Sequence, residues 1–217
     1  MSLLLVLLYI IGLYGAFIAG SMQRRTNHFA SRFHFPRATL LMTLAIAIPT
    51  TLQFFFPVIL NNFERDTMRF LSGDWWRIIT PLFVQDGGLA GSVFNLVSLL
   101  LVGSAAEQLW GGRKWIIIFL VGGILGELVA FAWQPVGAGN SVANFSLAAS
   151  VAVFCFAFNP PRPVRIASAL ALGACAVLLF LKDIHGAASL IGSLIAIIMI
   201  WFERHSHTWE IRRRFKQ

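Results

Sequence analysis

Two side chains of this sequence, Ser141 and His185, are of the types that together perform nucleophilic catalysis. A serine hydroxyl is a weak nucleophile until a neighbouring base removes its proton, and histidine is the base whose pKa suits that task near neutral pH. The tetrahedral intermediate of such a reaction also needs hydrogen-bond donors for its oxyanion. The candidates are the backbone N–H of Ser141, at the start of a helix, and the side-chain amide of Asn95. The chemistry would be acyl transfer, provided that the fold brings these groups together.

The composition indicates which kind of fold must position them. Of the 217 residues, 58% are hydrophobic and only 12% are charged, which leaves too few charged residues for the surface of a soluble domain of this size. Seven stretches reach or approach the roughly 20 apolar residues that a membrane-spanning helix needs. These stretches are residues 2–20, 38–60, 88–109, 115–133, 141–158, 165–181 and 184–202. We therefore expect an all-α polytopic membrane protein.

The basic residues lie between the apolar stretches, and their distribution predicts an orientation. If the segments alternate in direction, 13 of the 17 Lys and Arg residues fall on one side of the membrane and 4 on the other. The positive-inside rule then places the C-terminus in the cytoplasm and the N-terminus outside, in a multi-pass protein of the cell membrane. The net charge of +8 is explained by topology, so the expected partner is the lipid bilayer and not nucleic acid. The larger set is Arg24, Arg25, Arg32, Arg37, Arg113, Lys114, Arg162, Arg165, Arg204, Arg212, Arg213, Arg214 and Lys216, and the smaller set is Arg65, Arg69, Arg77 and Lys182.

The first apolar stretch has two interpretations. A cleaved signal peptide would begin with basic residues, but here Arg24 and Arg25 follow the apolar run instead. We therefore favour an anchor helix with its N-terminus outside. Residues 61–87 are too polar to span the membrane yet contain Trp75 and Trp76, so we expect this loop at the membrane interface, where tryptophan is favoured.

The alternation of the segments places the candidate catalytic groups at one depth. Ser141 begins the fifth segment and His185 begins the seventh, and both segments run in the same direction. Asn95 lies about two turns into the third segment, which runs in that direction too. Small residues such as Ala148 and Gly192 recur at helical spacing after Ser141 and His185, and this pattern lets membrane helices approach closely. We expect Ser141 and His185 to meet where these two helices contact each other.

A third, acidic partner for the histidine is not expected. Asp183 precedes His185 by two residues, and within one helix this spacing puts the two side chains on different faces. A Ser–His dyad is the economical interpretation. Each residue taken singly has a simpler explanation, because serine often caps helices and asparagine often joins membrane helices by hydrogen bonds. The shared depth and the two small-residue faces favour a site.

Several motifs, in order along the chain, resemble those of the rhomboid family. Gly139-Asn140-Ser141-Val142 is similar to the family's Gly-x-Ser-Gly nucleophile motif, and Phe145 stands where an aromatic residue packs on the catalytic histidine. His185 followed by Ala188 and Gly192 resembles the family's His-x-x-Gly-x-x-x-Gly helix. Trp76-Arg77 in the long loop is similar to its Trp-Arg pair. The second core helix of the family is resembled by Phe94-Asn95 with Gly103, Glu107 and Gly111.

The resemblance implies a rhomboid-like six-helix core at residues 38–202, preceded by one extra N-terminal transmembrane helix at residues 1–20. A basic cytoplasmic linker at residues 21–37 would join the two, and a basic cytoplasmic tail would follow at residues 203–217. The implied activity is a serine endopeptidase that cleaves transmembrane helices of other membrane proteins, which enter laterally, with no metal and no cofactor. Glu107 would be structural, bonding the outer loop or a helix end, and Arg77 would hold the outer loop.

Three positions depart from the family pattern. Val142 and Ala188 each replace a glycine, and Gly91 stands four residues before Asn95, where active members usually carry a histidine on the oxyanion side. Loss of one oxyanion donor can cost about a hundredfold or more in rate. The alternative function is therefore a non-catalytic rhomboid-like protein that binds membrane clients.

A transporter or channel is a third interpretation of the chain. Ionisable residues within membrane spans often mark ion pathways. Here Glu107, Glu127 and His185 fall at different depths and form no visible path, so this interpretation is not favoured. Cys155 and Cys175 lie inside apolar stretches without metal-ligand spacing, and we expect no redox role for them.

Overall fold

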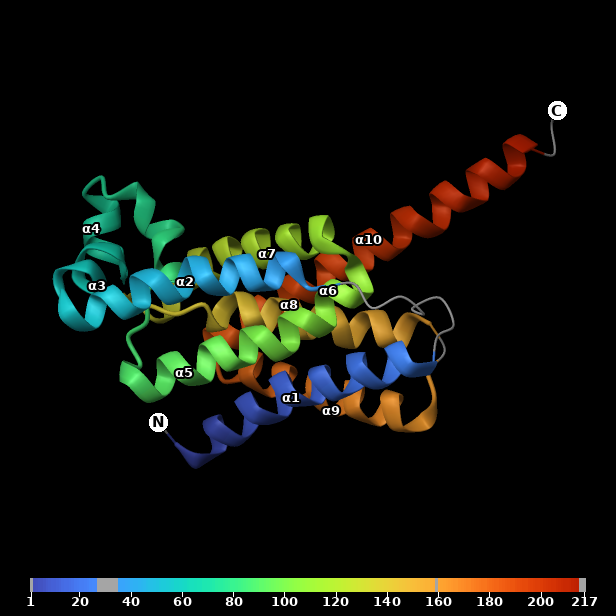
Figure 1. Cartoon of the computed structure of the whole chain (residues 1–217), viewed down its shortest axis with the longest axis horizontal. Coiled ribbons are helices and arrows are strands. Elements are labelled where there is room, and N and C mark those ends of the chain that lie inside the picture. The colour runs from blue at the N-terminus through green and yellow to red at the C-terminus, as the bar shows by residue number, and fades with distance from the viewer. Residues whose placement is uncertain (1, 27–34, 159, 215–217) are drawn as a thin grey trace.

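The computed structural model describes residues 2–26, 35–158 and 160–214, with side chains described as far as residue 205. The chain forms an elongated bundle of helices that run roughly along one axis (Figure 1). We call each helix, or unbroken series of helices, that runs along the bundle a rod. One rod is composite, because a π-helical segment joins two α-helices in its middle. The single rods are α1 (Leu3–Thr26), α2 (Arg37–Phe55), α7 (Gly112–Trp133), α8 (Ser141–Ala157), α9 (Arg162–Phe180) and α10 (Ile184–Arg214), and the composite rod is α5 (Gly88–Ser98), η4 (Leu99–Gly103) and α6 (Ser104–Trp110).

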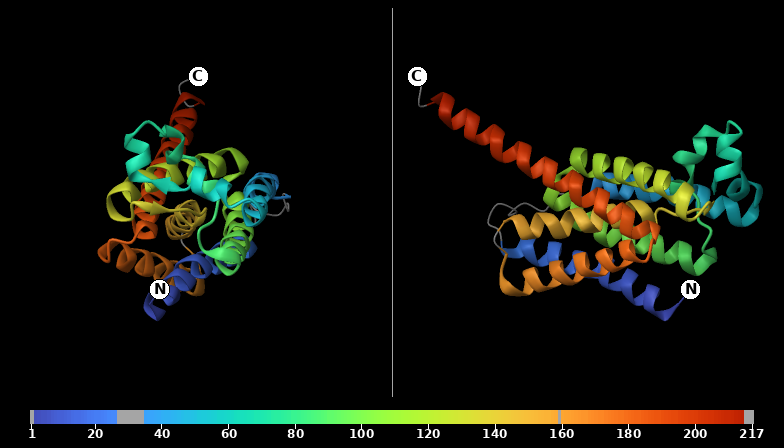
Figure 2. Two further views of the ribbon diagram at one scale, coloured as in Figure 1. Left: turned by 90° about the vertical axis from the view of Figure 1, so that its left-hand side faces the viewer. Right: turned by 180° about the vertical axis from the view of Figure 1, so that it is seen from behind.

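Six of the described rods are long and apolar enough to cross a membrane, which confirms the predicted all-α, multi-pass membrane protein. The remaining rod, α8, has only 17 residues. It contacts α1, α7, α9 and α10, and the end-on view in Figure 2 shows it in the middle of the bundle. Most of its residues are buried. Because its neighbours cover it, α8 does not need the full length of a lipid-facing helix.

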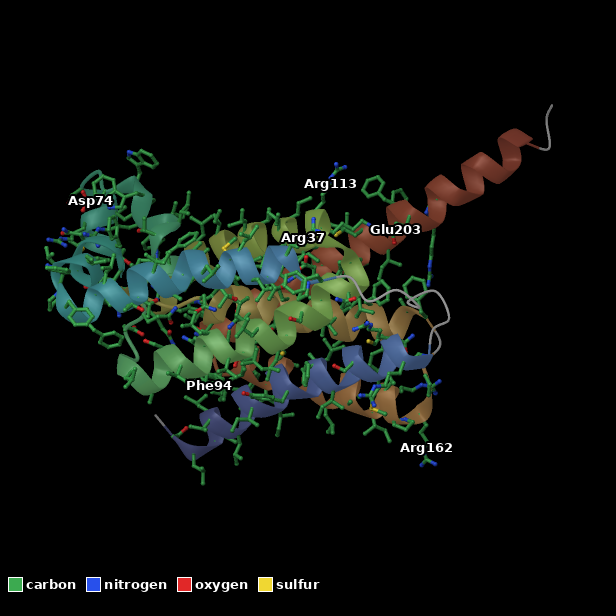
Figure 3. The ribbon with its side chains drawn as sticks, in the orientation of Figure 1. Arg37, Asp74, Phe94, Arg113, Arg162 and Glu203 are labelled. Atoms are coloured by element: carbon green, nitrogen blue, oxygen red, sulfur yellow. The ribbon has the colours of Figure 1, made fainter. Side chains whose placement is uncertain are left out.

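Successive rods run in opposite directions, so that α1, α5, α8 and α10 all begin at the same end of the bundle (Figures 1 and 2). The long loop between α2 and α5 folds over this end. Asp74 lies there, whereas Arg37, Arg113 and Arg162 lie toward the opposite end (Figure 3). The elements of the loop are α3 (Val58–Phe63), β1 (Arg65–Asp66), α4 (Thr67–Leu71), η2 (Trp75–Ile78) and η3 (Thr80–Phe83); β1 pairs antiparallel with β2 (Val136–Gly137).

The helix boundaries differ from the predicted segments in three places. The stretch predicted at residues 38–60 is broken after Phe55, because Pro57 disfavours a helical conformation at Phe56 and starts α3 instead. α10 continues to Arg214, past the predicted end at residue 202. α1 extends to Thr26, into the predicted linker, and residues 27–34 of that linker lie outside the described residues.

Glycine lets α10 and α7 pack closely against α8. At Gly192 of α10 an added Cβ atom would overlap the backbone of Ser146, and at Gly126 of α7 it would overlap the side chain of Val142. Val142 is almost fully buried in the space that Gly126 leaves. Small residues at the contact therefore set the distance between these helices, as is common in membrane bundles.

This packing predicts different effects for one substitution at two glycines. Gly192→Ala should destabilise the protein by about 1–3 kcal/mol, because α10 must move away from α8 to accommodate the methyl group. Gly173→Ala on α9 is the matched control, since its Cβ meets no atom within 4 Å and alanine favours a helix. Thermal unfolding in detergent should show a lower midpoint for Gly192→Ala only. Equal midpoints for the two variants would contradict the close contact.

Candidate active site

The loop before α8 places Ser141 at the first position of that helix. The backbone N–H of Gly139 donates to the carbonyl of Pro81 (2.9 Å), and that of Ala138 donates to the carboxylate of Asp86 (3.0 Å). The long loop thus holds the residues directly before Ser141, and the pairing of β1 with β2 holds those before them. The N–H groups of a first helical turn have no partner within the helix, so that of Ser141 is not used within α8.

Gly139 occupies a position that only glycine fits well. Its φ is +153°, and an added Cβ would lie 3.2 Å from Asn95 Nδ2 and 3.4 Å from Ser141 Oγ. The predicted oxyanion donor and the predicted nucleophile therefore lie close to one point beside Gly139. A side chain here would strain the backbone and fill the space between these two groups.

His185 lies in the first turn of α10 and reaches across to α8. Its Nε2 is 2.9 Å from Ser141 Oγ, a hydrogen-bonding distance. The side chain of His185 is about nine-tenths buried, which limits how far the ring can move. The two candidate catalytic residues, predicted to share a depth, thus lie in direct contact.

Asp183 also contacts the imidazole, so the prediction that no acidic partner meets His185 was wrong. Asp183 Oδ1 is 2.6 Å from His185 Nδ1 and accepts the backbone N–H of His185 at 2.9 Å. The helical spacing rule does not apply, because Asp183 precedes the first residue of α10 and caps it. Lys182, with φ +56°, makes the tight turn after α9 that leads into this cap. An aspartate at a predicted helix start was the signal available in the sequence.

The surroundings of Asp183 keep its carboxylate ionised. Burial alone would raise the pKa of Asp183, but hydrogen bonds from His185, the charge of His185 and a hydrogen bond from Tyr9 together hold that pKa below its usual value. An ionised carboxylate on Nδ1 fixes the histidine tautomer and leaves Nε2 free to accept a proton from Ser141.

Two aromatic rings enclose the imidazole. The ring centroid of Phe145 is 4.8 Å and that of Tyr9 is 4.6 Å from the centroid of His185. Phe145 is the residue that the sequence motif suggested for this contact. Tyr9 comes from α1 and was not predicted, and its hydroxyl donates to Asp183 Oδ2 over 2.7 Å. An isolated tyrosine in an apolar helix gave no signal of this contact.

Asn95 belongs to a closed ring of hydrogen bonds that runs through four amide side chains and the backbone carbonyl of Asn95. Asn95 Nδ2 donates to Gln85 Oε1 (2.8 Å), and Gln85 Nε2 donates to Asn140 Oδ1 (2.7 Å). Asn140 Nδ2 donates to Asn144 Oδ1 (3.0 Å), and Asn144 Nδ2 donates back to the backbone carbonyl oxygen of Asn95 (2.9 Å). The ring fixes Asn95 of α5 against the start of α8. Gln85 is a member that the sequence did not suggest.

Three of the predicted supporting residues, Trp76, Arg77 and Glu107, make hydrogen bonds within the long loop or at a helix end. Arg77 is buried and donates to the carbonyl of Glu64 (2.7 Å) and to Asp74 (3.0 Å). Trp76 Nε1 donates to the carbonyl of Asn62 at 3.3 Å. Glu107 lies elsewhere, at the start of α2, where its carboxylate accepts the N–H groups of Ala38 (3.0 Å) and Thr39 (2.8 Å). Of these residues, Trp76 and Arg77 lie in the loop and Glu107 caps a helix end.

A cavity of about 110 Å³ opens beside Ser141 and His185. It has room for a few water molecules and is bordered by charged groups that would attract them. Its lining also includes Arg65, Asp86, Glu127, Gln134 and residues 136–139.

A buried ion pair forms one wall of this cavity. Arg65 Nη1 lies 2.5 Å from Glu127 Oε2, and Arg65 Nε donates to the carbonyl of Gln134 (2.7 Å). The pair joins β1 of the long loop to α7, close to the strand pairing that leads to Ser141. Glu127, an acidic residue within a predicted span, thus has a partner that the sequence did not reveal.

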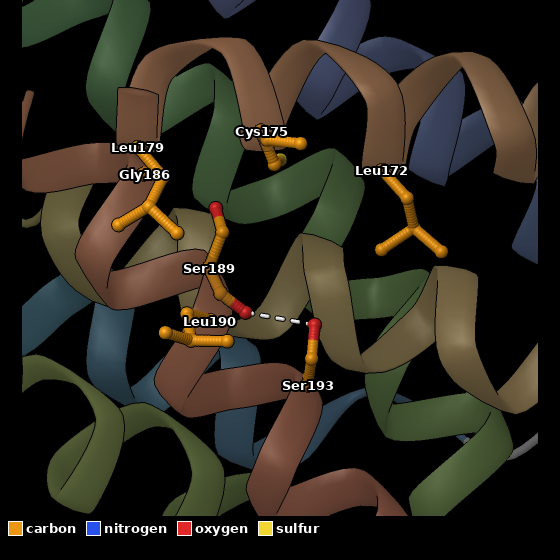
Figure 4. A pocket seen from close by; sticks show the side chains of 8 residues that line it. Leu172, Cys175, Leu179, Gly186, Ser189, Leu190 and Ser193 are labelled. Carbon is orange, nitrogen blue, oxygen red and sulfur yellow. Dashed lines mark hydrogen bonds between the residues drawn. The ribbon is translucent and has the colours of Figure 1, made fainter. Parts of the chain in front are cut away.

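A second cavity, of about 120 Å³, lies between α9 and α10 (Figure 4). Its serine hydroxyls are used within the helix, since Ser189 donates to the carbonyl of His185 and Ser193 to that of Ser189. Cys175 on its wall and Cys155 are buried thiols. In the part of the chain that the structure describes, no group of three or more His, Cys, Asp or Glu side chains is placed to hold a metal ion.

The fold and the site define a multi-pass membrane protein with a serine and a histidine in contact near one end of its helices. The sequence profile of the Rhomboid domain matches residues 72–206, more than half of the chain. The chain therefore belongs to the rhomboid family.

Three bacterial proteins share parts of this sequence. Rhomboid protease GluP of Bacillus subtilis (strain 168) is 38% identical over 74 residues, which cover 34% of this chain and 14% of GluP. The YdcA protein of the same organism is 29% identical over 133 residues (57% of this chain, 65% of YdcA). Rhomboid protease AarA of Providencia stuartii is 23% identical over 175 residues (65% of this chain, 62% of AarA). The chain thus spans less than two thirds of the length of each of these relatives.

The buried ion pair predicts a large loss of stability when one partner is removed. Glu127→Ala should cost about 3–5 kcal/mol, because Arg65 is left with an unpaired charge in the protein interior. The control is Glu203→Ala, which removes a carboxylate from the partly exposed pair with Lys114 and should cost less than about 1 kcal/mol. Denaturant unfolding in micelles measures both values. A similar, small loss in the two variants would show that Glu127 does not neutralise Arg65.

Proposed function

We propose that this protein is an intramembrane serine endopeptidase that cleaves transmembrane segments of other membrane proteins. The observation that carries the proposal is the contact of 2.9 Å between His185 Nε2 and Ser141 Oγ, on a ring whose Nδ1 is bound to Asp183. Membership of the rhomboid family supports the class of reaction.

In the proposed mechanism Ser141 is the nucleophile and His185 is the general base. Nε2 takes the hydroxyl proton as Oγ attacks the carbonyl carbon of the scissile peptide bond. Asp183 stabilises the imidazolium that forms. The same proton then passes to the leaving amine, and an acyl ester on Ser141 remains. Water, deprotonated by His185, hydrolyses that ester and regenerates the free serine.

Two donors are available for the oxyanion. The backbone N–H of Ser141 is in the first turn of α8, and the side-chain amide of Asn95 lies on the other side of the space beside Gly139. The ring of amide hydrogen bonds keeps Asn95 in place before substrate binds, so little reorganisation is needed as charge develops. The cavity beside Ser141 supplies the hydrolytic water.

The surroundings of the site fit a substrate that arrives from the membrane. Ser141 and His185 lie among helices with long apolar surfaces, at the end covered by the long loop. We propose that this end faces outward in the cell membrane, with the C-terminal tail in the cytoplasm, as the distribution of basic residues predicts. The substrates would then be cut near the outer ends of their transmembrane helices.

A non-catalytic role in binding membrane clients is the second candidate, and Gly91 is the observation that favours it. An added Cβ at Gly91 meets no atom within 4 Å, so the place of an oxyanion-side histidine one turn before Asn95 is open space. Val142, another of the three departures, is accommodated by Gly126 and adds no support.

A fluorophosphonate probe, which reacts with activated serines, tests the proposal. The purified wild type in detergent should be labelled, and labelling should disappear in Ser141→Ala and fall by about a hundredfold or more in His185→Ala. Ser146→Ala, at a serine five residues further along α8 whose hydroxyl donates to the carbonyl of Ile118, is the matched control and should be labelled like the wild type. A folded wild type that is not labelled would favour the client-binding role.

The open space at Gly91 predicts a gain of activity. Gly91→His should fold normally, because the Cβ has room and glycine is the weaker helix former. A histidine one turn before Asn95 adds an oxyanion donor, so labelling should become faster, by roughly tenfold or more. Gly91→Leu supplies similar bulk without a donor and should not accelerate the reaction. Equal rates for the His and Leu variants would show that the missing donor does not limit the rate.

A further inference from the structure

The first helix lies outside the residues that match the Rhomboid domain, yet it contributes a side chain to the candidate site. Tyr9 Oη donates to Asp183 Oδ2 at 2.7 Å, while Asp183 Oδ1 is bound to His185 Nδ1. With the contact between His185 and Ser141, a single line of hydrogen bonds runs from α1 to the nucleophile.

Close packing holds Tyr9 at this depth. α1 contacts both α8 and α9, and it lies beside α9 in all the views (Figures 1 and 2). At Gly12 an added Cβ would be 3.0 Å from the ring of Phe145, and at Gly15 it would be 3.3 Å from the carbonyl oxygen of Ala167. Larger residues would push α1 away, so these glycines keep the tyrosine hydroxyl within reach of Asp183.

The hydrogen bond from Tyr9 restricts the carboxylate of Asp183. The oxygen Oδ1 alone accepts both the ring N–H and the backbone N–H of His185. A carboxylate held only there could still turn about its Cβ–Cγ bond. With Tyr9 on Oδ2 both oxygens are fixed, so Oδ1 stays in line with Nδ1. The Tyr9 ring also packs on the imidazole, with centroids 4.6 Å apart.

We propose that Tyr9 is a positioning residue: it holds Asp183, which in turn orients His185 toward Ser141. α1 is then part of the catalytic unit as well as a membrane helix. This inference rests on the proposed function, because it assigns Tyr9 a role in that reaction.

The test compares Tyr9→Phe, which keeps the ring and removes the hydroxyl, with Tyr14→Phe on the same helix. The Tyr14 ring lies near that of Phe94, with centroids 6.4 Å apart. The rate of fluorophosphonate labelling is measured as a function of probe concentration. This gives a maximal rate constant and the probe concentration at which the rate is half-maximal. Tyr9→Phe should lower the rate constant by roughly three- to tenfold and leave the half-maximal concentration unchanged. Tyr14→Phe should match the wild type in both.

Three kinetic results would overturn the role of Tyr9. These are an unchanged rate constant in Tyr9→Phe, an equal loss in Tyr14→Phe, or a change in the half-maximal concentration alone, which would mean that α1 controls access. Rates are compared below the unfolding midpoint of every variant, so a loss of folded protein does not imitate the effect.

A spectroscopic measurement separates this inference from the proposed function. In protein labelled with ¹⁵N-histidine, the Nδ1–H proton signal of His185 is assigned by its loss in His185→Ala. Tyr9→Phe should shift this signal and Tyr14→Phe should not. A wild type that is unlabelled at Ser141 would overturn the proposed function and any catalytic role of Tyr9. A wild type that is labelled, with an unmoved signal in Tyr9→Phe, would overturn only the role of Tyr9.

Discussion

The close approach of α10 to α8 is the contact on which the candidate site depends. Ser141 and His185 begin these two helices, so the distance of 2.9 Å between Oγ and Nε2 exists only while the helices touch. Gly192 makes that contact possible, because any Cβ there would meet the backbone of Ser146. The apolar bundle around α8 supplies the packing that keeps both helices in place, since lipid gives no hydrophobic drive for helices to associate.

The second constraint is that polar groups inside such a bundle must be bonded to each other. The side-chain amides of Gln85, Asn95, Asn140 and Asn144 form a ring that closes on the backbone carbonyl of Asn95, and Arg65 neutralises Glu127. Because unsatisfied polar groups are costly away from water, these networks favour one arrangement of the loop against the helices. The chemistry proposed for Ser141 uses groups that this arrangement already holds, so the proposed catalysis and the folding depend on the same contacts.

Much of the architecture could be predicted, because the alternation of apolar segments and basic loops indicates the direction of each helix and the depth of each residue in the membrane. The alternation alone predicts that Ser141, His185 and Asn95 lie in one layer. The prediction failed for Asp183, because helical spacing was applied to a residue that lies just before the first residue of the helix. Tyr9, Gln85 and the partner of Glu127 were missed for a different reason: depth does not tell which side chains of separate segments meet. Pro57, by contrast, is visible in the sequence as a residue that interrupts a helix, and the predicted segment 38–60 did not take it into account.

The central claim is that Ser141 cleaves peptide bonds of membrane-spanning helices, and proteolysis in liposomes tests it most directly. Wild type and Ser141→Ala would each be reconstituted with a set of fusion proteins that differ in their single transmembrane helix, and the products identified by mass spectrometry. The account predicts that the wild type cuts at least one fusion near the end of its transmembrane helix and that Ser141→Ala cuts none. Cleavage that persists in Ser141→Ala, or a folded wild type that labels at Ser141 yet cuts no fusion, would contradict it.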